Sequence, residues 1–226
     1  MHKEKYILAI EASARNCSVA ISLGNKVIAN LYEPYPSMQA ERLIPMADAV
    51  LKSSNLTFKD IDYLVTTRGP GSFTGIRIAL AAAAGFLIAN SHITPVILNN
   101  FNFYHWRAKK QVANFDYSIV LIDTYRGGCY MAIFDSRDAL YGSYDFYFHE
   151  DLIKFLTDFQ IDKQLICSGN YLSPIYNSID NTNIILLPRF AIVQAKTLCK
   201  LAYENIVSGN IEHALEPLYI SQAITN

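Results

Sequence analysis

A glycine-rich stretch at residues 68–75 carries the residue types best suited to chemistry. It follows a short β-branched run and precedes an apolar segment typical of a helix. Backbone amides of Gly69, Gly71 and Ser72 could hold an anion there, because the first N–H groups of a helix have no internal partner. The stretch lacks a phosphate-loop lysine and is one residue too long for the dinucleotide fingerprint. The sequence equally allows that these glycines only permit a tight turn and close helix–sheet packing.

Two carboxylates, Glu11 and Asp123, each follow an apolar run typical of a buried strand. Acids at strand ends could bind a metal through water or orient a nucleophile, or could simply be polar caps where the strands reach solvent. The five histidines show no ligand spacing and the four cysteines form no C-x-x-C pair. We therefore predict no catalytic residue and no metal-binding residue.

The elements that position these residues occur twice in the same order. The first set is strands at 5–10, 17–23 and 26–32, a helix at 38–53, a strand at 63–67 and a helix at 75–89. The second set is strands at 118–123, 129–134 and 140–148, a helix at 150–159, a strand at 164–167 and a helix at 192–208. Residues 93–98 form a linking strand, 99–111 a helix or loop, and 178–183 a disordered-looking insertion. This β-β-β-α-β-α repetition predicts two α/β lobes, 1–100 and 101–226, facing each other across a cleft that receives the strand ends.

The helix predicted at 75–89 is apolar around its whole circumference, and Arg77 is its only charge. A sheet covers only one side, so another helix, from the same chain or from a partner, must cover the rest. We place the partner surface on this helix and the helix at 38–53, and expect self-association when the partner is absent. The predicted interface residues are Met38, Arg42, Pro45, Met46, Arg77, Ala79, Ala82, Ala83 and Phe86.

Composition narrows the class of protein. With 226 residues, 51% of them hydrophobic, the chain is globular, and its net charge of −1 argues against holding nucleic acid by itself. The longest apolar run, residues 78–89, is shorter than the ~20 residues of a membrane span. The apolar run near the N-terminus is too short for a signal peptide, and the scattered cysteines are typical of reduced thiols. We expect a cytoplasmic protein.

The segment RGPGSFTGIRI at residues 68–78 resembles the signature of the bacterial TsaB (YeaZ) family of tRNA threonylcarbamoyladenosine proteins. Supporting segments lie at 8–11, 17–20, 41–46 and 216–220, and at 122–123 with Gly127 and Tyr130. The resemblance covers nearly the whole chain, strongly before residue 97 and thinly after residue 130. It implies the actin-like, sugar-kinase-type ATPase fold with two RNase-H-like lobes.

The same resemblance implies a non-catalytic scaffold that dimerises with the catalytic paralogue TsaD and recruits the ATPase TsaE, so that threonylcarbamoyl is placed on the adenosine beside the tRNA anticodon. The complex uses ATP, this chain binds no cofactor alone, and tRNA is met only through the complex. The paralogue carries an H-x-x-x-H metal motif on its first helix, whereas residues 37–46 contain no histidine. Three departures from the family pattern, at Glu11-Ala12, Gln39 and Tyr125, weaken the case for nucleotide binding by this chain.

Two other functions fit the same fold. An independent ATPase or small-molecule kinase would need a second carboxylate in the cleft and a phosphate loop in each lobe, and only one lobe has a convincing glycine loop. A peptidase is less favoured, because metal ligands and a nucleophile are missing from the pattern.

Overall fold

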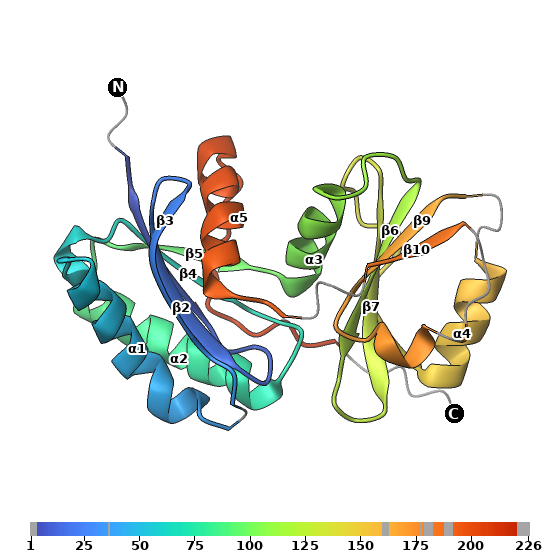
Figure 1. Ribbon diagram of the computed structural model, residues 1–226, viewed down its shortest axis with the longest axis horizontal. Helices are drawn as coiled ribbons and strands as arrows, with labels where there is room; N and C mark the ends of the chain where they lie inside the picture. The colour runs from blue at the N-terminus through green and yellow to red at the C-terminus, as the bar shows by residue number, and fades with distance from the viewer. Residues whose placement is uncertain are drawn as a thin grey trace. The chain divides into compact units, whose positions relative to one another are not determined.

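The computed structural model describes residues 4–35, 37–159, 163–176, 178, 183–187 and 192–220. The chain divides into two compact units (Figure 1). The first comprises the residues up to Asn100 together with Val193–Leu218, and the second comprises Phe101–Ile192 and the residues from Tyr219 onward. The predicted division at residue 100 therefore does not hold for Val193–Leu218, which packs with the first unit.

The first unit is built on a five-stranded sheet of order β3-β2-β1-β4-β5. The central strand β1 (Tyr6–Glu11) pairs antiparallel with β2 (Cys17–Leu23), which pairs antiparallel with β3 (Lys26–Glu33). On its other side β1 runs parallel to β4 (Tyr63–Thr67), and β4 to β5 (Thr94–Leu98). Every residue of β1 after Tyr6 is buried, since helices cover both faces of the sheet.

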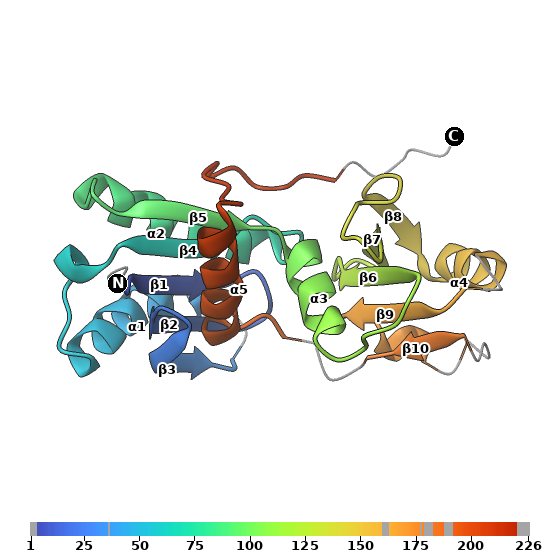
Figure 2. The ribbon, with the colours of Figure 1, turned by 90° about the horizontal axis from the view of Figure 1, so that it is seen from above.

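Helices α1 (Gln39–Ser53) and α2 (Phe73–Ala89) pack on one face of this sheet, and α5 (Ala195–Ser208) packs on the other (Figures 1 and 2). A short 3-10 helix, Phe58–Asp60, precedes β4. The helix at 192–208 was predicted to complete the second lobe, and this prediction was wrong. Its buried face, including Leu198 and Cys199, lies against β1 and β2, with the Cys199 Sγ 4.0 Å from the Ile7 carbonyl oxygen.

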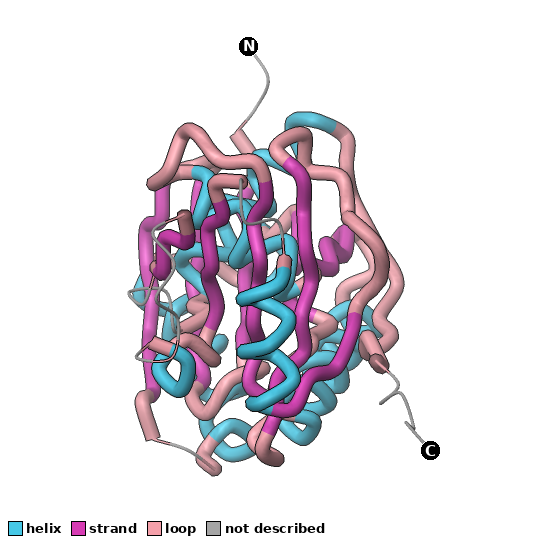
Figure 3. The backbone as a smooth tube through the Cα atoms, turned by 90° about the vertical axis from the view of Figure 1, so that its right-hand side faces the viewer, coloured by secondary structure: helices cyan, strands magenta, loops and turns pink. Residues whose placement is uncertain are grey.

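The second unit repeats the sheet, in the order β10-β9-β6-β7-β8. Its elements are α3 (Asn100–Lys109, within the unit from Phe101), β6 (Tyr117–Asp123), β7 (Gly128–Asp135), β8 (Asp145–Phe148), α4 (His149–Asp158), β9 (Leu165–Gly169) and β10 (Ile184–Leu186). Figure 3 looks at this sheet from the side of α4, and Figure 1 shows α3 on the opposite face. In both units the first strand is central, with its antiparallel hairpin on one side and two parallel strands on the other. The predicted repeat is thus confirmed as far as β-β-β-α-β.

The two units differ after the fourth strand. Where the first unit has α2, the described residues of the second unit form a 3-10 turn, Ser173–Ile175, with Pro174 in its first turn. Strand β8 is shorter than the predicted 140–148, since Gly142 takes φ +79° and only Leu140 forms an isolated bridge, to Phe134. Strand β10 was not predicted, and residues 179–182 of the predicted insertion lie outside the described residues. Within the described residues, no helix has the length and apolar character needed to cross a membrane.

Candidate functional site

The glycine-rich loop connects the carboxyl end of β4 to the start of α2. Ser72 caps α2, its Oγ accepting a hydrogen bond from the Gly75 amide at 3.3 Å. The Ser72 amide donates to the Ser13 carbonyl oxygen at 2.6 Å. An N–H group already bonded within the chain cannot also hold an anion without breaking that bond. The Ser72 amide is therefore not available for the predicted anion site.

The glycines of this loop are required by close contact with the turn after β1. A Cβ on Gly71 would lie 2.4 Å from the Ser13 carbonyl oxygen, and one on Gly75 would lie 1.8 Å from the Ala12 carbonyl oxygen. Both obstacles are backbone atoms, so neither can rotate away. Gly69 takes φ +98°, a conformation that favours glycine. Of the two interpretations left open by the sequence, the geometry favours tight packing over anion binding.

Glu11 is fully buried at the end of β1 and bonded on both carboxylate oxygens. Its Oε1 accepts hydrogen bonds from the Ser13 amide at 2.5 Å and from the Ser13 hydroxyl, and its Oε2 accepts from the Thr67 hydroxyl at 2.8 Å. Burial raises the pKa of Glu11 above its ordinary value, and the hydrogen bonds from Ser13 and Thr67 offset part of that rise. Glu11 joins β1, its following turn and β4, instead of reaching solvent as a polar cap would.

Asn100 completes this network, and the sequence reasoning missed it. Its Nδ2 donates to the Ser13 hydroxyl and to the Pro70 carbonyl oxygen, both at 2.8 Å, and its amide donates to the Gly69 carbonyl oxygen at 2.8 Å. The only sequence signal was an asparagine at the start of the helix at 99–111. We call Glu11, Ser13, Thr67 and Asn100 the latch, because they fasten the turn after β1 to the glycine-rich loop.

Asp123 occupies the matching strand end in the second unit, and is half-buried. Its Oδ1 accepts a hydrogen bond from the Tyr125 amide, and its own amide donates to the Asn170 Oδ1, both at 2.7 Å. No group of three His, Cys, Asp or Glu side chains suited to a metal ion occurs in the part of the chain that the structure describes. Glu11 and Asp123 belong to different units, and the cleft expected to unite them stays a prediction.

The outer face of the α1–α2 pair exposes large apolar side chains. Ile88 is 85% exposed, Ile44 54% and Phe73 52%, the last with the Arg77 guanidinium 3.8 Å above its ring centre. Along α2 the exposed positions Arg77, Ala81, Gly85 and Ile88 recur at helical spacing. We call these four residues the outer α2 face.

The structure corrects three of the predicted interface residues. Met46, Ala79 and Ala83 are buried in the core of the first unit, because α2 turns the face containing Ala79 and Ala83 toward α1 and the sheet. Six predicted residues remain at least partly exposed: Met38, Arg42, Pro45, Arg77, Ala82 and Phe86. Ala81, Gly85 and Ile88, which were not among the predicted residues, are exposed, since an all-apolar helix does not show in its sequence which side faces the sheet.

Parts of the sequence are similar to proteins of known families. A family model described as "TsaD: tRNA N6-adenosine threonylcarbamoyltransferase" matches residues 37–132. The tRNA threonylcarbamoyladenosine biosynthesis protein TsaB of Buchnera aphidicola subsp. Schizaphis graminum is 42% identical over 77 residues, 34% of this chain and 36% of that protein. The chain thus matches little more than a third of the length of that curated relative.

Solved structures match over most of the chain. A Pseudomonas aeruginosa protein described as similar to peptidase YEAZ superimposes with a TM-score of 0.76 at 21% identity, covering 96% of this chain and 100% of that one. A Bacteroides thetaiotaomicron protein described as having an actin-like ATPase fold and unknown function gives 0.51 at 9% identity, covering 88% and 96%.

The two sheets of matching strand order and these structural matches define an actin-like ATPase fold, as predicted. Over about a third of its length the chain is similar to a protein named TsaB, and over most of its length it shares the fold of the YeaZ-like structure.

Proposed function

We propose that this chain is a non-catalytic scaffold in tRNA threonylcarbamoyladenosine biosynthesis. The TsaB relatives support the pathway, and the family-model match to TsaD includes both α1 and α2. The observation that carries the scaffold role is the outer α2 face. A helix that exposes Ile88 at 85%, with Ala81 and Gly85 beside it, resembles one half of a helix–helix contact.

In this proposal, α1 and α2 meet the equivalent helix pair of TsaD and form a four-helix contact. The small side chains at Ala81 and Gly85 allow close approach of the partner helix, and a Cβ on Gly85 would meet no described atom within 4 Å beyond the adjacent residues and the nearby backbone of α2. Such a surface also pairs with a second copy of itself when TsaD is absent. The TsaD complex would then recruit TsaE, use ATP and meet tRNA in the cytoplasm.

The latch supports the non-catalytic part of the proposal. The Glu11 carboxylate accepts three hydrogen bonds and has no exposed surface, so both of its oxygens are used in joining the turn after β1 to β4. An ATPase or kinase of this fold would need that strand-end acid to face its substrate.

A reconstituted modification reaction tests the proposal. Purified TsaD, TsaE, ATP, a threonylcarbamoyl donor and an unmodified tRNA transcript are incubated with and without the chain, and threonylcarbamoyladenosine is quantified by mass spectrometry. We expect modification only when the chain is present, and the same yield with an Asp123→Asn variant. Equal modification without the chain would overturn the scaffold role, as would ATP hydrolysis by the isolated chain that Asp123→Asn abolishes.

A further inference from the structure

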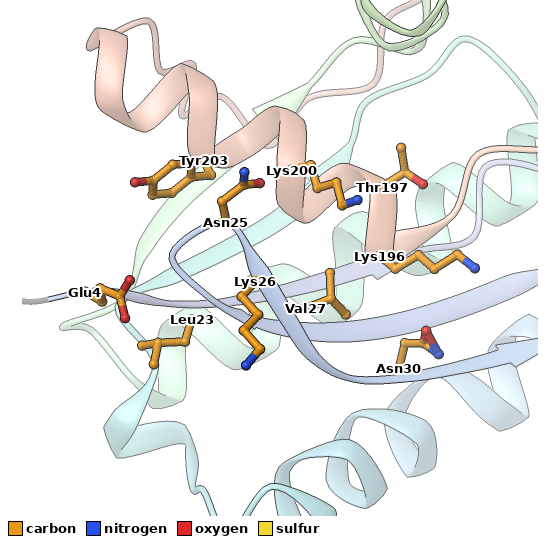
Figure 4. A pocket seen from close by; sticks show the side chains of 10 residues that line it. All are labelled: Glu4, Leu23, Asn25, Lys26, Val27, Asn30, Lys196, Thr197, Lys200 and Tyr203. Carbon is orange, nitrogen blue, oxygen red and sulfur yellow. The ribbon is translucent and has the colours of Figure 1, made fainter. Parts of the chain in front are cut away.

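A groove in the first unit lies between the β2–β3 hairpin and α5, away from the α1–α2 face (Figures 1 and 4). Its volume is about 760 Å³. Its lining includes three lysines, Lys26, Lys196 and Lys200, and only one acid, Glu4. We call it the α5 groove. It is a local concentration of positive charge on a chain whose net charge is −1.

Within the part of the chain that the structure describes, the charged groups of the α5 groove form no ion pair. Lys196 and Lys200 are exposed and lie one turn apart on α5, a spacing at which like charges repel and weaken a helix. Among the described residues neither forms an ion pair, whereas Lys5, Lys52 and Lys109 each contact an aspartate. Two adjacent unpaired ammonium groups over a groove are the arrangement that an anion stabilises.

The remaining lining groups suit a phosphate ester chain. Figure 4 shows Asn30 on β3 pointing toward the α5 side of the groove, where Thr197 and the two α5 lysines lie, with Val27 between strand and helix. Asn25 lies at the hairpin end near Tyr203, and the Lys26 side chain runs away from α5. Amide and hydroxyl groups hydrogen-bond phosphate or ribose oxygens, and Val27 and Tyr203 offer apolar surface to a sugar or base.

The exposure of Lys196 and Lys200 indicates which class of anion the groove binds, a small anion or a polyanion. Sites for free phosphate use buried backbone amides or a glycine loop, and both lysines here are exposed. An exposed lysine gains little from one phosphate, but a polyanion releases condensed counterions at every contact. We infer that the α5 groove binds the phosphate backbone of RNA, which, given the proposed function, is the tRNA presented to the complex. Two or three contacts give weak binding alone, in agreement with the net charge.

Binding of the isolated full-length chain to a labelled tRNA transcript tests this inference. Fluorescence anisotropy is recorded between about 50 and 200 mM salt for wild type and for a Lys196→Ala/Lys200→Ala double variant. Removing two phosphate contacts should lower the slope of log K against log salt by about 1.5 and weaken binding on the order of tenfold at the lowest salt. A Lys59→Ala/Lys154→Ala double variant removes the same charge outside the groove and should retain the wild-type slope.

Three results would overturn the inference: no binding by wild type, equal loss in both double variants, or complete displacement of RNA by inorganic pyrophosphate at a matched phosphate concentration. The last result would identify a small-anion site instead. Circular dichroism melting of each variant ensures that lost binding does not reflect unfolding. Because no TsaD is present, this experiment can fail while the scaffold role stands, and the reverse also holds.

Discussion

Gly75→Ala and Gly85→Ala place the same methyl group at two positions of α2 with opposite expected effects. At Gly75 the new Cβ would lie 1.8 Å from the Ala12 carbonyl oxygen, where ordinary contact begins near 3.4 Å, so the helix start must move by about 1.6 Å. The start of α2 lies against the turn after β1 and the latch, and the atom in the way, the Ala12 carbonyl oxygen, belongs to the backbone. We expect a loss of about 3 kcal/mol, at the upper end of the usual cost of overpacking.

Gly85→Ala is the matched control, because a Cβ there meets no described atom within 4 Å beyond the adjacent residues and the nearby backbone of α2. Replacing a helix-interior glycine by alanine should stabilise the first unit by up to about 1 kcal/mol. For a chain of this size each kcal/mol moves Tm by roughly 2–4 °C. Differential scanning calorimetry should therefore show Tm lowered by about 6–12 °C for Gly75→Ala and raised by up to about 4 °C for Gly85→Ala. Equal melting of Gly75→Ala and wild type would refute the packing of α2 against the turn after β1.

Three further outcomes follow from burial and charge. Ala81→Glu should abolish self-association in sedimentation velocity while leaving the far-UV circular dichroism spectrum unchanged, whereas Ala113→Glu, on an exposed loop of the second unit, should change neither. Burial raises the pKa of Glu11 in the folded state. The contribution of Glu11 to the free energy of unfolding is therefore complete below its unfolded pKa and is lost as pH rises through its folded pKa. Urea unfolding should show that the stability of Glu11→Gln relative to wild type increases from about pH 4 to pH 7. All four cysteines are buried, and burial raises the Cys17 pKa to about 11 and the Cys129, Cys167 and Cys199 pKa values to about 12, so iodoacetamide should modify none at pH 8 until the chain unfolds.

Much of the fold could be predicted from local pattern. The apolar run of β1, the Gly24-Asn25 turn and the helical spacing of α1 each reflect short-range physics, and their repetition revealed the second sheet. The position of α5 could not be predicted this way. Its periodicity shows that one face is buried, but Leu198 and Cys199 do not specify which of two similar sheets covers them.

The candidate site was only partly predictable for a related reason. Glu11 was singled out correctly as a strand-end acid, but its role depends on Thr67, 56 residues away in the sequence, and on Asn100, which binds Ser13 across 87 residues. Similarly, the apolar character of α2 predicted a covered helix, whereas only its packing shows that Ala83 faces inward and Ala81 outward.

The proposed scaffold role depends most on docking of the chain on TsaD through the outer α2 face. The decisive measurement is threonylcarbamoyladenosine formed per tRNA in the reconstituted reaction as Ala81→Glu is titrated in place of wild type, with Ala113→Glu as the matched control. We predict that Ala81→Glu requires a much higher concentration to support modification, in proportion to its loss of TsaD binding, and that Ala113→Glu behaves as wild type. Full modification at the wild-type concentration of Ala81→Glu would contradict the claim.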